Sequence, residues 1–111
     1  MAYDEGLAER IRELVAGERG ISEKRMFGGL AFLLDGHMAI AASGQGGALV
    51  RVDPADTGTL LAKGPAEPMV MRGREMDGWV RVPSEALRTR AQLSRWTERA
   101  LAFVRTLPPK A

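Results

Sequence analysis

The spacing of hydrophobic residues changes along the chain, and each change predicts a different element. Over residues 3–16 the apolar positions recur every three or four residues with charged residues between them, which is the period of an amphipathic helix. Over residues 24–53 they run together or alternate in short segments, which is typical of β-strands. Helical spacing returns over residues 91–107, and the two prolines that follow end the predicted helix.

Turn signals divide the middle of the chain into short elements. Asp35-Gly36 is typical of a two-residue hairpin turn, and the segment SGQGG at residues 43–47 is a second flexible turn. Pro54 ends one strand and suits the first turn of a short helix. The predicted elements are strands at 24–27, 30–34, 38–42 and 49–53, a helix at 55–62, and strands at 68–71 and 78–82 joined by a turn over 72–77.

The resulting order is α-β-β-β-β-α-β-β-α. Tight turns join antiparallel neighbours, whereas parallel neighbours need a long crossover connection. We therefore predict an α+β fold with a mainly antiparallel sheet of five to six strands flanked by helices. The chain has 111 residues and shows neither an internal repeat nor a linker, so we expect a single domain over residues 1–111.

Composition narrows the class of protein further. The chain is 45% hydrophobic and 27% charged, which is ordinary for a soluble domain, and it has no cysteine for disulfides, thiolate catalysis or zinc ligation. It shows no signal-peptide pattern and no apolar stretch near the roughly 20 residues that span a bilayer, so we expect a cytoplasmic protein that does not enter a membrane. A net charge of +2 permits nucleic-acid binding without indicating it.

The segment KRMFGGLAFLLDGHMAIAAS at residues 24–43 holds two features that resemble reactive or ligand-binding groups. The pair Gly28-Gly29 connects strands and does not open a helix, as a phosphate-binding loop would, so we interpret it as a bend in a β-ribbon. His37, the one histidine, has no nucleophile or orienting carboxylate at a suitable spacing, and we interpret it as a surface residue of the turn. We predict no catalytic, metal or cofactor site.

A group of arginines around a tryptophan suggests an interaction surface. Arg51 alternates with valines in one predicted strand, and Trp79 and Arg81 alternate with valines in another. If the valines face the core, these three side chains share the opposite face, where they suit a protein interface or single-stranded nucleic acid. The alternative is that Trp79 is buried under a helix and the arginines are only solubilising. The full candidate surface is Lys24, Arg25, Arg51, Arg72, Trp79 and Arg81.

Other large side chains are interpreted as core. Methionine fills irregular gaps and also lines adaptable binding surfaces, and we favour the first role in the predicted sheet. Trp96 and Phe103 of the last helix are also expected to pack inward, with Phe103 off the main apolar stripe. The methionines concerned are Met26, Met38, Met69, Met71 and Met76.

One set of residues extends over nearly the whole chain in a single register. Its members are Arg25-Met26-Phe27-Gly28-Gly29, Phe32, Gly36, Met38, Leu49, Arg51, Pro68-Met69, Gly73-Arg74, Met76, Gly78-Trp79-Val80, Leu93, Trp96, Ala100-Leu101 and Leu107-Pro108-Pro109-Lys110. In these residues the chain resembles the N-terminal domain family of TfoX/Sxy, the regulators of bacterial competence. The resemblance implies an α+β domain without established catalytic residues. The competence regulators carry a second, helical domain, so we expect a stand-alone N-terminal module here.

The residues and the resemblance together suggest a non-enzymatic module that acts by protein–protein contact in the regulation of transcription or of competence-like processes. The expected partner is a transcription regulator, such as the cyclic-AMP receptor protein to which the family is linked, or a second copy in a homodimer. The alternative is direct nucleic-acid binding through a basic sheet face. An enzyme is the least favoured class, because no nucleophile, base and orienting group stand at a recognisable spacing.

Overall fold

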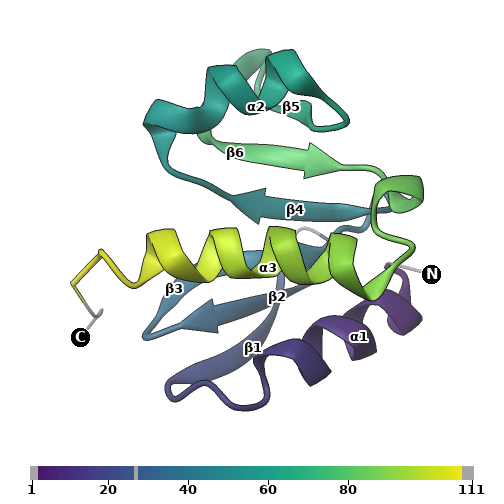
Figure 1. Cartoon of the computed structure of the whole chain (residues 1–111), viewed down its shortest axis with the longest axis vertical. Helices are drawn as coiled ribbons and strands as arrows, with labels where there is room; N and C mark the ends of the chain where they lie inside the picture. Colours follow the sequence, from purple (N-terminus) through teal and green to yellow (C-terminus); the bar gives the residue numbers. More distant parts are fainter. Residues whose placement is uncertain (1–2, 27, 109–111) are drawn as a thin grey trace.

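The computed structural model describes residues 3–26 and 28–108 and has the predicted α+β fold (Figure 1). Its elements are α1 (Glu5–Val15), β1 (Ile21–Met26), β2 (Gly29–Leu34), β3 (His37–Ala42), β4 (Ala48–Arg51), α2 (Thr57–Lys63), β5 (Glu67–Met71), β6 (Arg74–Val82) and α3 (Arg90–Val104). Short 3-10 turns, η1 (Pro54–Asp56) and η2 (Ser84–Ala86), precede α2 and α3. The predicted order of helices and strands is confirmed.

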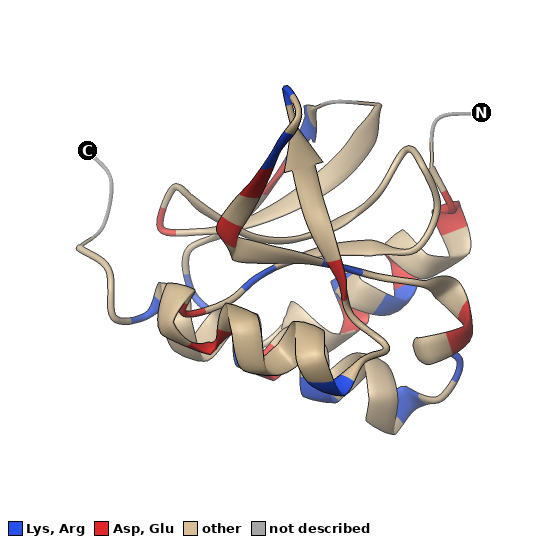
Figure 2. Ribbon diagram, turned by 90° about the horizontal axis from the view of Figure 1, so that it is seen from above, with Lys and Arg blue, Asp and Glu red and all other residues tan. Residues whose placement is uncertain are grey.

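The strands of the described residues form one six-stranded antiparallel sheet in the order β1-β2-β3-β4-β6-β5. Chain neighbours are therefore sheet neighbours except at β6, which lies between β4 and β5. The helices α1 and α3 cover one side of the sheet, in front of it in Figure 1. In Figure 2 the helices gather below the sheet, and the strands rise from the side without helices. We call that side the open face.

Both long helices begin at a residue whose side chain accepts one of their free backbone N–H groups. The carboxylate of Asp4 accepts the N–H of Leu7 at 3.0 Å at the start of α1. At the start of α3, Thr89 and Gln92 form a reciprocal capping box, with bonds of 2.9 and 3.0 Å. These caps explain why both helices begin within a residue or two of the predicted position.

The end of α3 differs more from the prediction than its start does. The apolar pattern predicts a helix to residue 107, and α3 ends at residue 104. The N–H of Thr106 donates to the carbonyl of Phe103 at 2.9 Å, which is a tighter turn than that of an α-helix.

Within residues 3–26 and 28–108, no helix has both the length and the apolar character needed to cross a bilayer.

The β5–β6 hairpin is longer than predicted, and the predicted turn over 72–77 is wrong. Only Arg72 and Gly73 form the turn, with φ of 55° and 78°, and β6 begins at residue 74. Two positive φ values in succession give the two-residue turn that matches the twist of paired strands. The prediction for Asp35-Gly36 is confirmed by the same geometry, with φ of 51° and 86°.

The first hairpin differs from prediction at its polar strand. β1 begins at Ile21, three residues earlier than predicted. The sequence gives no sign of this start, because residues 22–25 are exposed at the edge of the sheet and show no apolar alternation. Gly28 lies in the turn between β1 and β2 with φ of 75°, and Gly29 is the first residue of β2, so the bend predicted at the glycine pair is a hairpin turn. Phe27, predicted to end the strand, and the matched Pro109 and Lys110 lie outside the described residues.

The main core lies between the sheet and the helices, and a second cluster lies on the open face. The largest fully buried side chains of the main core include Phe32, Ile11, Ile40, Leu93, Val50 and Val80. The open-face cluster consists of buried Ala31, Ala41, Leu49 and Met69 with half-buried Met26, Leu33, Met38, Met71 and Trp79. Trp96 and Phe103 pack against the main core, as predicted. The sheet therefore carries apolar side chains on both faces while helices cover one.

Candidate functional site

The pairing of β4 with β6 brings part of the candidate surface together. Arg51 is directly opposite Trp79, and Leu49 is directly opposite Arg81. The valines of both strands face the helices, which confirms the alternation predicted from the sequence. Trp79 packs in the open-face cluster and is half-buried, so it is not covered by a helix.

Arg51 lies between two aromatic rings. Its guanidinium carbon is 5.2 Å from the ring centre of Trp79 and 5.7 Å from that of Phe103 on α3. β4 pairs with β3 only as far as Val50, so Arg51 lies beyond the last pair, where its side chain reaches the helix. No carboxylate of the described residues forms an ion pair with it, and partial burial lowers the pKa of Arg51. Cation–π contacts therefore hold this guanidinium in place.

Arg81 has a polar partner and a nearby carboxylate. Its Nη1 donates to Oγ of Ser43 at 3.0 Å, and the backbone N–H of Gln45 donates to the same oxygen at 3.1 Å. Glu67 stands directly opposite Arg81 across the β5–β6 pair, but in the described part of the chain no ion pair within 4.0 Å joins Arg81 to any carboxylate. Arg81 is half-buried with most of its donors unused.

A hollow of about 180 Å³ opens on this face between the two edges of the sheet. Its lining includes Met26 of β1 together with Met69 and Met71 of β5, although β1 and β5 are at opposite ends of the strand order. The sheet must curl for these edges to meet. Figure 2 shows the β1–β2 and β5–β6 hairpins rising on the side away from the helices. Met38, Ser43, Leu49, Val70 and Arg81 also line the hollow.

The outer part of the β5–β6 hairpin extends beyond the rest of the sheet. β4 pairs with β6 only at residues 79–82, and beyond them β6 pairs with β5 through Arg74 and Glu75. Among the described residues, the large hydrophobic side chains that are exposed are Val70 (56%) and Met76 (37%), and both lie in this hairpin. Arg72 occupies its turn and is exposed. No local pattern in the sequence marks Val70, which stands between two methionines in the predicted strand over 68–71.

The two basic residues of β1 point in different directions. Both are exposed. Lys24 is paired with Ala31, whose side chain lies on the open face, whereas Arg25 is paired with Leu30, whose side chain lies in the main core. Lys24 therefore shares the open face with Trp79 and Arg81. The side chain of Arg25 leaves the strand on the opposite face, the one that the helices cover.

His37 is the first residue of β3 and does not lie in the turn where the sequence placed it. It is half-buried, and its Nε2–H donates to the carbonyl oxygen of Pro108 at 2.6 Å. This contact fixes the chain that follows α3 against the sheet. No group of three or more histidine, aspartate or glutamate side chains within residues 3–26 and 28–108 is placed to hold a metal ion.

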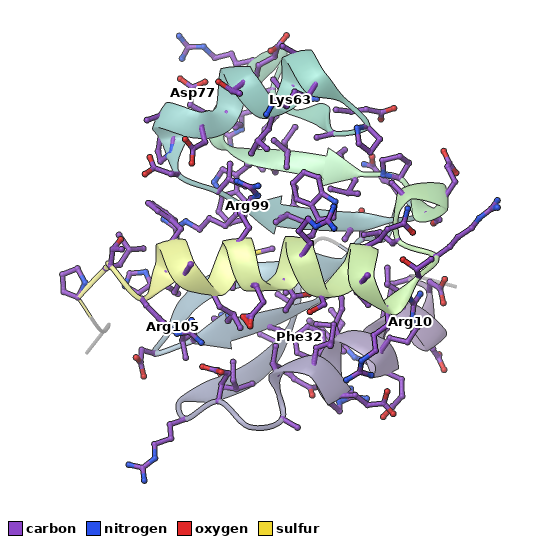
Figure 3. The ribbon with its side chains drawn as sticks, in the orientation of Figure 1. Arg10, Phe32, Lys63, Asp77, Arg99 and Arg105 are labelled. Atoms are coloured by element: carbon purple, nitrogen blue, oxygen red, sulfur yellow. The ribbon has the colours of Figure 1, made fainter. Side chains whose placement is uncertain are left out.

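The ion pairs of the described residues lie beside the helices, at Arg12 with Glu9 and Glu23 and at Arg105 with Glu18. Arg12 bonds to Glu9 and Glu23 at 2.6 Å, and the bond from Arg12 lowers the pKa of Glu23. Arg10 of α1 reaches the segment before α3, where its Nη2 donates to the carbonyl of Leu87 at 2.7 Å (Figure 3). The helix side is thus stabilised by internal contacts, while the open face keeps Arg81 and exposed apolar side chains available.

Comparison with known proteins agrees with this fold. None of the curated proteins matches the chain. The model of the TfoX N-terminal domain matches residues 13–104, which run from α1 to the end of α3 and include the whole sheet. This chain therefore belongs to the TfoX N-terminal domain family.

Proposed function

We propose that this domain is a non-enzymatic regulatory module that binds a partner protein through its β5–β6 hairpin and the adjoining open face. The observation that carries the proposal is the hairpin itself. It extends past the sheet and holds Val70 and Met76, the exposed large hydrophobic side chains of the described chain. Apolar side chains grouped on one projecting element, with basic Arg72 and Arg74 beside them, have the composition of an interface.

The same hairpin has a firm base, which suits a binding element. Trp79 packs in the open-face cluster and is stacked on Arg51, and the N–H of Gly78 donates to Oγ1 of Thr57 at 2.8 Å. Interfaces gain affinity when the contacting residues are held in place before binding, because less conformational freedom is then lost. The family's link to transcriptional regulators of competence supports a regulatory partner.

The edges of the sheet do not favour association by strand pairing. β5 contains Pro68, which has no backbone N–H to donate, and β1 exposes charged residues along its centre. Both features block edge-to-edge pairing in natural sheets. Side chains of the hairpin therefore make the proposed contact, and a homodimer, if formed, would use this surface.

Direct nucleic-acid binding receives less support. Two arginines of the candidate surface are half-buried and already have contacts within the chain. Arg51 lies between two aromatic rings, and Arg81 donates to Ser43. Phosphate contacts would come from Lys24 and Arg72, and so few contacts give weak binding at physiological salt.

The test is affinity purification of the tagged chain from its native cell, with sedimentation of the purified protein. The double variant Val70→Ser/Met76→Ser should lose the co-purified protein. The control Ala91→Ser/Ala102→Ser also introduces two serines, at exposed positions of α3, and should retain it. Equal retention of the partner by both variants would refute the hairpin contact. Nucleic acid recovered at low salt and lost steeply as salt rises would favour the alternative.

A further inference from the structure

We propose that the hollow on the open face binds a small monocarboxylic acid with an apolar body of about six to eight carbon atoms. Its wall carries four methionines and a leucine, and the guanidinium of Arg81 stands at its polar end beside Ser43. An apolar space with one positively charged group matches a ligand that has one negative charge and an apolar body. This inference does not depend on the protein contact proposed above.

The size of the hollow sets the size of the ligand. It holds about 180 Å³. An apolar protein cavity of about 150 Å³ can hold benzene, so this hollow has room for a ring or a short alkyl chain with the carboxylate at its mouth. Methionine side chains are flexible and polarisable and adapt to ligands of different shape. The lining methionines are Met26, Met38, Met69 and Met71.

The charge of the ligand follows from Arg81. A guanidinium has five N–H donors, and here Nη1 is the donor to Ser43. The remaining N–H groups can donate to a carboxylate in the paired geometry that arginine favours. Arg81 is half-buried, and no described carboxylate lies within 4.0 Å of it, so a bound carboxylate would supply the missing counter-charge. Glu67, directly opposite, is the natural competitor for that place.

Phenylacetate is a suitable probe, because its ring shifts the resonances of nearby methyl groups. The chain would be labelled with ¹³C at the methionine methyl groups and titrated with sodium phenylacetate. The methyl signals of Met26, Met38, Met69 and Met71 should shift and saturate together. Met76 is exposed outside the hollow and should not shift, so it serves as an internal control.

Two further ligands separate the roles of charge and apolar surface. 2-Phenylethanol has the same ring without the carboxylate and should bind at least about tenfold more weakly, since a hydrogen-bonded charge is lost. Acetate has the charge without the ring and should give no saturable shift of these methyl signals. Equal binding of phenylacetate and 2-phenylethanol would overturn the assignment of Arg81 as the recognition group.

Three variants complete the test. Arg81→Gln should weaken phenylacetate by about tenfold. Lys24→Gln removes a charge from the same face outside the hollow and should leave the affinity within about twofold. Glu67→Gln removes the competing carboxylate and should tighten binding. If Arg81→Gln fails to fold, the Glu67→Gln result and the neutral ligand still decide the question.

The proposal is overturned by any of three results: no saturable shift below about 10 mM, equal shifts at Met76 and the lining methionines, or weaker binding by Glu67→Gln. Failure here can be told apart from failure of the partner experiment, because Arg81 and Glu67 carry this test. The partner test uses Met76, which lies outside the hollow, together with Val70, which also lines it.

Discussion

Replacing Thr57 by valine should destabilise the protein, because one hydrogen bond connects α2 to the base of the β5–β6 hairpin. The N–H of Gly78 donates to Oγ1 of Thr57 at 2.8 Å, and both residues are buried. Valine keeps the shape of threonine but leaves that N–H without an acceptor, which costs roughly 1–3 kcal/mol. The added methyl group returns up to about 0.8 kcal/mol of burial. We therefore expect Thr57→Val to lower the free energy of unfolding by about 1–2 kcal/mol.

Thr97 provides a matched control with the opposite sign. It lies in α3 with 2% of its surface exposed, and its Oγ1 is buried without a hydrogen-bond partner among the described residues. Thr97→Val removes an unsatisfied hydroxyl and buries a methyl group, while threonine and valine have similar helix propensities. We expect this variant to be more stable than the parent by about 1 kcal/mol.

Urea unfolding followed by tryptophan fluorescence measures both changes. The midpoint should fall for Thr57→Val and rise for Thr97→Val, with the slope unchanged in each case. In thermal unfolding, each kcal/mol corresponds to about 4 °C for a chain of this size. The reasoning is refuted if Thr57→Val is as stable as the parent protein, or if both variants are destabilised equally.

Three further variants test other contacts. Gly47→Ala should lower the thermal midpoint, because Gly47 has φ of 66° and a Cβ there would meet the carbonyl of Val82. Gly17 has open space around it, so Gly17→Ala should leave the midpoint unchanged, and equal midpoints for the two variants would contradict this. Arg51→Leu should destabilise the protein by about 1–2 kcal/mol in urea unfolding, because the guanidinium is removed from between its two rings, and an unchanged midpoint would show that stacking contributes nothing. The bond from Arg12 lowers the pKa of Glu23. The stabilisation by this ion pair is therefore present above the unfolded glutamate pKa near 4.5 and is lost as pH falls through the lower folded value. The stability difference between the parent protein and Glu23→Gln should vanish in acid, and a constant difference from pH 7 to acid would contradict this.

Local patterns in the sequence predict most of the fold. The helical period over residues 3–16 is enough to place α1, and Asp35-Gly36 is enough to place the β2–β3 turn. Alternation in β4 and β6 puts Arg51 and Trp79 on one face. Each of these features depends on residues close together in the chain.

The remaining features depend on tertiary structure. β1 is polar because it is an edge strand, and its position at the edge becomes visible only once the strand order is known. The stacking of Arg51 on Phe103 joins β4 to α3, and no local pattern indicates it. The hollow requires the sheet to curl until Met26 and Met71 line the same space. Of the methionines predicted to fill the core, Met26, Met38, Met69 and Met71 line a space that the helices leave open, and Met76 is exposed.

Hydrogen–deuterium exchange tests the central claim, a protein contact through the β5–β6 hairpin, most directly. Deuterium uptake would be compared between the chain alone and the complex purified with its partner from the native cell. The account predicts slower exchange over residues 67–82 in the complex and unchanged exchange over α1. Protection confined to α1 and α3, with the hairpin exchanging as freely as in the isolated chain, would contradict it.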